Sequence, residues 1–239
     1  MTVPIDELRR KARYAGFLYL LSGLTAPIGL LYVPGKLIVS GNAAATADNI
    51  RASGSLLRIG IASELFGQVV FVFLVLALFR LFESVNKRQA TLMVVLILVS
   101  TPIAMLSVAS EIGTLTLLGG ENFLSAFDKS QLDALSYLFI RLHGAGLDVA
   151  SIFWGLWLFP FGMLVIESGF IPRILGYLLM IAGSGYLLNV ASVILAPQYE
   201  HQVHQVMMIF GLGELPIMFW LLIWGARWQS TSPRAMEAA

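Results

Sequence analysis

Long apolar segments recur along the whole chain, and they constrain its fold more than any other feature of the sequence. A helix crosses the hydrocarbon core of a bilayer when it has about 20 predominantly apolar residues in succession. The segments that reach this length lie at residues 14–39, 57–81, 90–118, 136–165, 172–195 and 203–226. The sequence therefore predicts an all-α fold, a polytopic membrane helical bundle of six transmembrane helices.

The composition favours a single transmembrane domain over residues 1–239. Hydrophobic residues make up 58% of the chain and charged residues 12%, whereas ordinary soluble domains carry about 25% charged residues. The apolar segment that follows "RRKAR" is longer than the core of a signal peptide, so we interpret it as a retained first span. The polar stretches between spans, such as "FESVNKRQ", leave no room for a soluble domain.

The same composition limits the partners that we expect. The lipid bilayer is the main one, and no basic cluster with interleaved aromatic residues indicates a nucleic acid. The chain has no cysteine, which excludes disulfides, thiolate nucleophiles and iron–sulfur ligands. The sequence leaves the oligomeric state open.

The distribution of lysine and arginine predicts the orientation, because cytoplasmic loops are enriched in these residues. Ten of them fall on one side of the predicted bundle: Arg9, Arg10, Lys11, Arg13, Arg80, Lys87, Arg88, Arg173, Arg227 and Arg234. Five fall on the other side: Lys36, Arg51, Arg58, Lys129 and Arg141. We therefore expect a multi-pass protein of the plasma (inner) membrane with both termini in the cytoplasm.

Four acidic residues fall inside the predicted spans, where an ionised group is unfavourable by roughly 2.5–3.5 kcal/mol. Glu64 and Glu111 lie roughly 10 Å below the outer surface, and Asp148 and Glu214 roughly 16 Å below it. Arg58, Arg141 and the histidines His143, His201 and His204 lie on the same outer side. Because gathering these groups would offset much of their burial cost, we expect them to form one outward-facing polar cavity.

Small and polar residues at helical spacing predict which helix faces line this cavity. The stripes are Gly60, Glu64, Gly67 and Gln68 on the second span, Ser100, Ser107, Glu111 and Thr114 on the third, Arg141, Gly144, Asp148 and Ser151 on the fourth, and Gly185, Asn189 and Ser192 on the fifth. Such stripes also allow close helix packing without any binding function. Arg141 and Asp148 are equally compatible with a structural ion pair.

Glu214 has a local context of its own. Pro216 removes a backbone donor two residues later, and Gly211 and Gly213 loosen the same turn. An acid at a broken turn near the middle of the membrane is typical of a binding or proton site.

These features favour binding or transport of a small ligand, a cation or a proton, with a lipid head group as another candidate ligand. A zinc-dependent intramembrane hydrolase with His143, His201 and His204 as metal ligands is an alternative. Haem ligation by His143 and His204 is a further alternative, and so is a structural or assembly role. We expect no cofactor, and the sequence leaves open whether the chain is an enzyme.

Several segments resemble the bacterial domain of unknown function 4386 family of integral-membrane proteins. They are "RYAGFLYLLSGL", "AAATADNIRASGSLLRIGIASEL", "RLHGAGLDVASIFWG", "FWGLWLFPFGMLVIESGFIPRILGYLLMIAGSGYLL" and "GELPIMFWLLIWGAR". By this resemblance His143, Pro172, Arg173 and Glu214 fall on positions that recur in the family. The resemblance implies a membrane location and no known activity.

Overall fold

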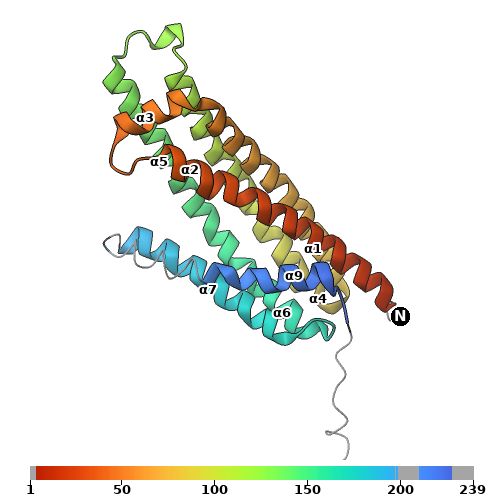
Figure 1. The fold of residues 1–239 in the computed structure, drawn as a ribbon. Helices are drawn as coiled ribbons and strands as arrows, with labels where there is room; N and C mark the ends of the chain where they lie inside the picture. The colour runs from red at the N-terminus through yellow and green to blue at the C-terminus, as the bar shows by residue number, and fades with distance from the viewer. Residues whose placement is uncertain (1–3, 197, 199–209, 228–239) are drawn as a thin grey trace, which may run out of the picture. The chain divides into compact units, whose positions relative to one another are not determined.

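The structure is a computed structural model of the chain, and it describes residues 4–196, 198 and 210–227. Within these residues the regular secondary structure is helical and no strand occurs, which confirms the all-α prediction. The elements are α1 (Ile5–Pro27), the π-helix η1 (Ile28–Tyr32), α2 (Val33–Leu37), α3 (Ala43–Ala52), α4 (Gly54–Leu118), η2 (Asn122–Leu124), α5 (Lys129–Leu156), α6 (Leu158–Ser168), α7 (Arg173–Leu195), η4 (Leu212–Glu214) and α9 (Leu215–Ile223) (Figure 1).

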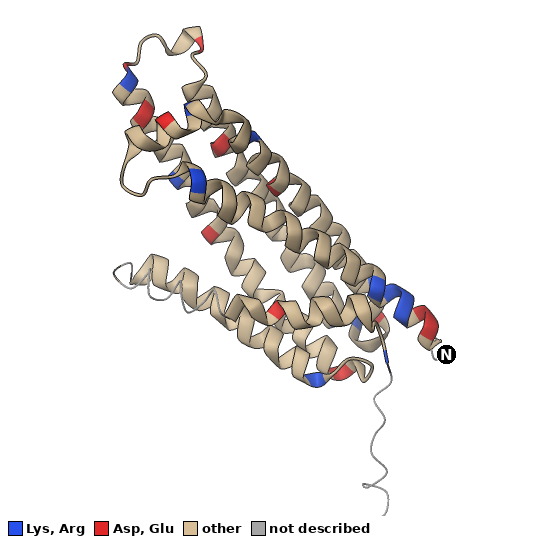
Figure 2. Cartoon of the chain, viewed as in Figure 1, with Lys and Arg blue, Asp and Glu red and all other residues tan. Residues whose placement is uncertain are grey.

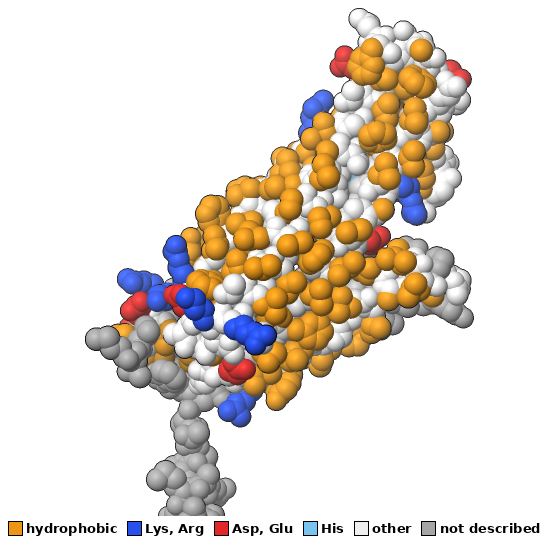
Figure 3. All heavy atoms as spheres, turned by 180° about the vertical axis from the view of Figure 1, so that it is seen from behind, with side chains coloured by type: hydrophobic (Ala, Val, Ile, Leu, Met, Phe, Trp, Pro, Cys, Tyr) orange, Lys and Arg blue, Asp and Glu red, His pale blue; other side chains and the backbone are white. Residues whose placement is uncertain are grey.

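Four helical segments in the described part are long and apolar enough to cross a membrane: Ile5–Leu37, Gly54–Leu118, Lys129–Ser168 and Arg173–Leu195. Large apolar side chains are exposed on them, for example Leu106 at 74% and Leu195 at 81%. Apolar side chains cover much of the face seen in Figure 3, and few charged residues interrupt the long helices in Figure 2. Because exposed apolar surface of this extent is unfavourable in water, these helices fit a membrane environment.

The predicted spans 57–81 and 90–118 are the two halves of α4, which breaks at Asn86 (φ −155°, ψ 94°). The Asn86 side chain accepts a hydrogen bond from the backbone N–H of Gln89 at 3.2 Å and donates one to Oε2 of Glu167 at 3.1 Å. Asn86 therefore acts as the N-cap of the second half. The predicted sixth span, 203–226, begins outside the described residues, and its described end consists of η4 and α9.

The chain divides into two compact units. The first comprises Met1–Phe17, Val75–Val95 and Gly155–Ala239, and the second comprises Leu18–Leu74 and Leu96–Trp154. Ten lysines and arginines are predicted to be cytoplasmic, and nine of these are described residues of the first unit. The five that are predicted on the opposite side all belong to the second unit.

In the first unit, α6 and α7 form a close antiparallel hairpin. A β-carbon on Gly162 in α6 would lie 2.6 Å from the carbonyl oxygen of Gly176 in α7, and one on Gly155, at the end of α5, would lie 2.9 Å from that of Gly183. Only residues without side chains allow such a backbone approach, which is the packing mode that small residues provide in membranes. The hairpin turns at Gly169, whose φ of 71° is the left-handed conformation that glycine adopts readily.

In the second unit, the first predicted span packs along the small-residue stripe of α4. Gly60 contacts Val33, Glu64 contacts Gly29, and Gly67 contacts Thr25, so the two segments run antiparallel. This arrangement confirms that the predicted stripe on the second span is a packing face. At one end of the unit, a core of buried apolar residues joins α2, α3, α4 and α5: Val33, Leu37, Ile50, Leu57, Ile61, Val108 and Ile140.

Ionic contacts attach α3 to the beginning of α5 in the second unit. Asp133 forms salt bridges with Arg51 and with Lys129, the latter at 3.0 Å, and its side chain is only 5% exposed. Arg51 and Lys129 each also bridge to Asp48 at 3.0 Å. The hydrogen bond from Lys129 holds the pKa of the Asp48 carboxyl below its usual value. This network fixes α3 over the end of the unit.

Candidate functional site

Three ionisable side chains meet in the interior of the second unit. Glu64 comes from the first half of α4, Glu111 from the second half, and His143 from α5. Their exposed fractions are 5%, 3% and 7%. Nε2 of His143 lies 3.5 Å from Oε2 of Glu64 and 3.8 Å from Oε1 of Glu111, and one ligand atom from each residue lies within 4.8 Å of the others. We call these three residues the Glu–Glu–His cluster.

Two carboxylate oxygens of the cluster lack a hydrogen-bond partner among the described residues. They are Oε1 of Glu64 and Oε2 of Glu111. Buried polar groups in folded proteins are nearly always hydrogen-bonded, and an unpaired one is unfavourable by about 1–3 kcal/mol. The arrangement therefore has unsatisfied capacity to bind a proton or a positively charged ligand.

Gly29 in η1 sets the position of Glu64. A β-carbon at residue 29 would lie 2.8 Å from Oε1 of Glu64 and closer still to its Cγ, so a larger residue cannot occupy this position without moving the carboxylate. The π-helical turn is bounded by Pro27 and is followed by Pro34 in α2. Local π-helical turns occur frequently at functional sites, because they shift the register of one helix face. Sequence analysis did not identify Gly29, although the closely spaced prolines around it were a signal.

Contacts between α5 and the second half of α4 set the position of His143. A β-carbon on Gly146 would lie 2.8 Å from Cβ of Ser107, and Oγ1 of Thr114 donates a hydrogen bond to the carbonyl oxygen of Ser136 at 3.3 Å. Ser107 and Thr114 belong to the stripe predicted on the third span, and both are buried. The prediction that this stripe faces the interior is therefore confirmed.

The prediction of which residues of the fourth span face the interior is only partly correct. Arg141 and Gly144 are exposed and Asp148 is half-buried, whereas Ser151 is buried. The buried face of α5 is instead formed by Ser136, Ile140, His143, Ala150 and Ser151. The buried face of α5 differs from the predicted face because apolar residues contribute to it as much as polar ones. The prediction considered polar and small residues alone.

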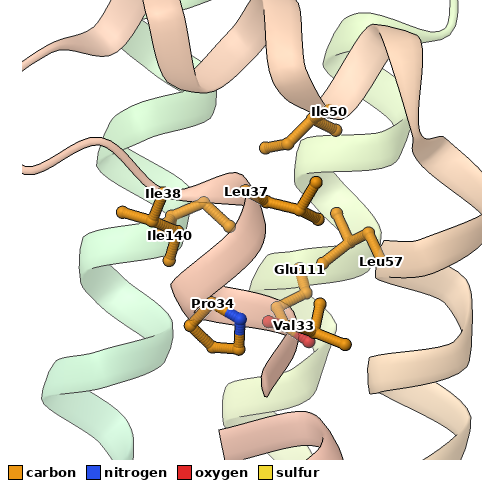
Figure 4. A pocket seen from close by; sticks show the side chains of 8 residues that line it. All are labelled: Val33, Pro34, Leu37, Ile38, Ile50, Leu57, Glu111 and Ile140. Carbon is orange, nitrogen blue, oxygen red and sulfur yellow. The ribbon is translucent and has the colours of Figure 1, made fainter. Parts of the chain in front are cut away.

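A small apolar space adjoins Glu111 at the α2–α3 end of the unit. It is lined by Val33, Pro34, Leu37, Ile38, Ile50, Leu57, Glu111 and Ile140 (Figure 4). Glu111 is the only ionisable residue of this lining, and the space has room for about one water molecule. The rest of this lining is apolar, and the outward-facing polar cavity that the sequence predicts stays a prediction.

The other site residues predicted in the second unit are not among the three side chains that meet. Arg58 and Arg141 are exposed, and Asp148 lies on another side of α5 from His143. Glu214 belongs to the other unit, at the start of α9, where the hydroxyl of Tyr186 is its hydrogen-bonding neighbour. His201 and His204 lie outside the described residues, so the predicted three-histidine metal site and the haem pair remain predictions.

Comparisons with known proteins place the chain in a family. An uncharacterised protein from Archaeoglobus fulgidus is 35% identical over 81 residues, which make up 34% of this chain and 47% of the relative. The match thus spans about half of that protein's length. No solved structure matches the chain. The sequence pattern of the family described as "Domain of unknown function (DUF4386)" matches residues 14–225, as the resemblance in its apolar segments predicted. This match covers most of the chain, which therefore belongs to the DUF4386 family.

Proposed function

We propose that this chain is a multi-pass membrane protein that binds a proton or a cation at the Glu–Glu–His cluster. The observation that carries the proposal is the meeting of two carboxylates and an imidazole from three helical segments, each less than a tenth exposed. Ionisable residues inside membrane proteins are rare and mark ion pathways, proton relays or ligand sites by default.

The unfavourable free energy of burying two acids supports a bound proton or cation at the cluster. An acid in the middle of a membrane helix is unfavourable by roughly 2.5–3.5 kcal/mol on the insertion scale, and placing two acids together adds their mutual repulsion. A cationic side chain, protonation or a bound cation neutralises such a pair, and the described contacts of Glu64 and Glu111 include no Arg or Lys salt bridge. Bound protons or a bound cation reduce this penalty.

Infrared difference spectroscopy of the purified chain tests the proposal directly. A change of pH around neutrality or of cation concentration should alter the carboxyl bands of wild type. Glu64→Gln and Glu111→Gln should each lose part of this change, whereas Glu121→Gln, in an exposed loop, should retain it. The same carboxyl signal in wild type and in both cluster variants would show that the cluster does not bind either species.

The proposal includes six spans, cytoplasmic termini and a plasma-membrane location. The distribution of ten against five lysines and arginines supports this orientation. Because the chain has no cysteine, single-cysteine labelling can test it without background. Ser125→Cys should react with a membrane-impermeant maleimide on intact cells, whereas Ser84→Cys, which is also exposed, should react only after permeabilisation. The reverse pattern would invert the topology.

A further inference from the structure

We infer that the Glu–Glu–His cluster is a site for a divalent transition-metal ion of the zinc class. Nε2 of His143 and one carboxylate oxygen from each of Glu64 and Glu111 would be its ligands. The inference rests on the proposed function, because it names which cation the cluster binds.

The distances within the cluster fit ligands of one metal better than a hydrogen-bonded network. The N···O separations of 3.5 and 3.8 Å exceed the usual hydrogen-bond range of about 2.7–3.2 Å. In a tetrahedral zinc site with bonds of about 2.0–2.1 Å, neighbouring ligand atoms are roughly 3.4 Å apart. The two separations lie close to this value, and the ligand atoms of all three residues lie within 4.8 Å of one another, so a zinc ion fits between them after the side chains close in on it.

The type of ligand selects the class of metal. Imidazole nitrogen suits zinc, copper, iron and nickel, whereas magnesium and calcium take six or more oxygen ligands. The described cluster offers one nitrogen and two carboxylate groups. Zinc takes both histidine nitrogen and carboxylate oxygen, and zinc sites with three protein ligands leave a fourth position for water.

The charge of the cluster points to a divalent ion. Two ionised carboxylates and a neutral imidazole carry two negative charges, which one divalent cation neutralises. A monovalent ion would leave one charge uncompensated among buried apolar residues, which is strongly unfavourable.

The surroundings also match a metal site. A water-sized space adjoins Glu111, one of the three proposed ligands (Figure 4). Metal-bound histidines usually donate their second N–H to a backbone carbonyl or a carboxylate. The backbone carbonyl of Ser107 adjoins the His143 ring and is an available acceptor for this purpose.

Metal binding to the full-length chain in detergent tests the inference. The protein is stripped with a chelator, equilibrated with zinc or cobalt, freed of unbound metal and analysed for its metal content. We expect stoichiometric zinc in wild type and an intense visible cobalt spectrum of tetrahedral type. Glu64→Gln, Glu111→Gln and His143→Ala should each weaken binding at least about 100-fold.

Matched controls separate this site from the other ionisable residues. Asp148→Asn, Glu214→Gln and the double variant with His201→Ala and His204→Ala should all keep the metal. Loss of zinc in the double variant but not in His143→Ala would overturn the inference, and so would an octahedral cobalt spectrum of wild type. Because the cobalt spectrum is measured on wild type, it tests for a tetrahedral metal site even if a cluster variant fails to fold.

Failure of this inference can be told apart from failure of the proposed function. If wild type binds no stoichiometric zinc while its carboxyl bands still depend on Glu64 and Glu111, the cluster binds a proton or another cation and the metal inference is wrong. If neither signal depends on these residues, the proposed function is wrong as well.

Discussion

Gly29 contacts Glu64 so closely that a β-carbon on residue 29 would lie 2.8 Å from the carboxylate oxygen Oε1. The glycine lies in the π-helical turn η1, and the acid lies on the opposing stripe of α4. The position of a buried carboxylate is thus fixed by a residue that has no side chain of its own.

Gly29→Ala should weaken ligand binding at the Glu–Glu–His cluster, because the added methyl group displaces Glu64. We expect roughly a tenfold loss of zinc affinity, similar to that caused by changing residues that orient metal ligands. Equilibrium metal binding to the purified variant measures the effect.

Gly35→Ala is the matched control, because no atom of the described residues lies within 4 Å of the position of its added β-carbon. Its zinc affinity should equal that of wild type. Equal losses in both variants would show that the glycine-to-alanine change acts on the fold of this segment and not on Glu64.

Gly162→Ala should destabilise the α6–α7 hairpin. Its β-carbon would lie 2.6 Å from the carbonyl oxygen of Gly176, so the two helices must separate. Overpacking of this kind is unfavourable by about 1–3 kcal/mol. Thermal unfolding in detergent should show a lower midpoint, whereas Gly144→Ala, which meets open space, should be neutral or stabilising by about 0.4–1 kcal/mol.

Asp133→Ala should destabilise the second unit, because this nearly buried carboxylate binds both Arg51 and Lys129. Loss of hydrogen bonds to charged groups is unfavourable by about 1.5–3 kcal/mol. Asp48→Ala removes contacts with the same two cations but from an exposed position, and it should have a much smaller effect. Equal shifts of the unfolding midpoint would contradict the importance of the buried acid.

The contribution of Asp128 to the stability of the fold, just before α5, should depend on pH. Its Oδ1 accepts hydrogen bonds from the backbone N–H of Gln131 at 2.9 Å and from Ser130 at 2.7 Å. These bonds, with that of Gln131 the larger cause, lower the pKa of Asp128 below its ordinary value of 3.8. Its carboxylate therefore stabilises the fold at pH values above the unfolded pKa, and this stabilisation is lost as the pH falls through the lower, folded pKa.

Asp128→Asn isolates this contribution, because asparagine also caps helices but does not titrate in this range. The difference in unfolding midpoint between wild type and the variant should be constant near neutral pH and should shrink in acid. A difference that stays constant down to pH 2 would show that Asp128 does not contribute through its charge.

The sequence by itself determined the long apolar helices and several of their ends. Apolar length established the long membrane-type helices, "FESVNKRQ" located the break of α4 at Asn86, and "ESGFIPR" located the turn between α6 and α7. It also identified Glu64 and Glu111 as buried acids on helix faces that pack inward. These features are local, because chain length, glycine, proline and polar turn residues act within a few positions of themselves.

Only the tertiary structure decided which of the ionisable residues meet. It joined Glu64, Glu111 and His143, left Arg58 and Arg141 exposed, and introduced Gly29 as the residue that positions Glu64. The physical reason is that a helix in a membrane is apolar on both its lipid-facing and its buried sides. Hydrophobic periodicity therefore does not fix its rotation, which depends on side-chain packing between segments that are far apart in the sequence.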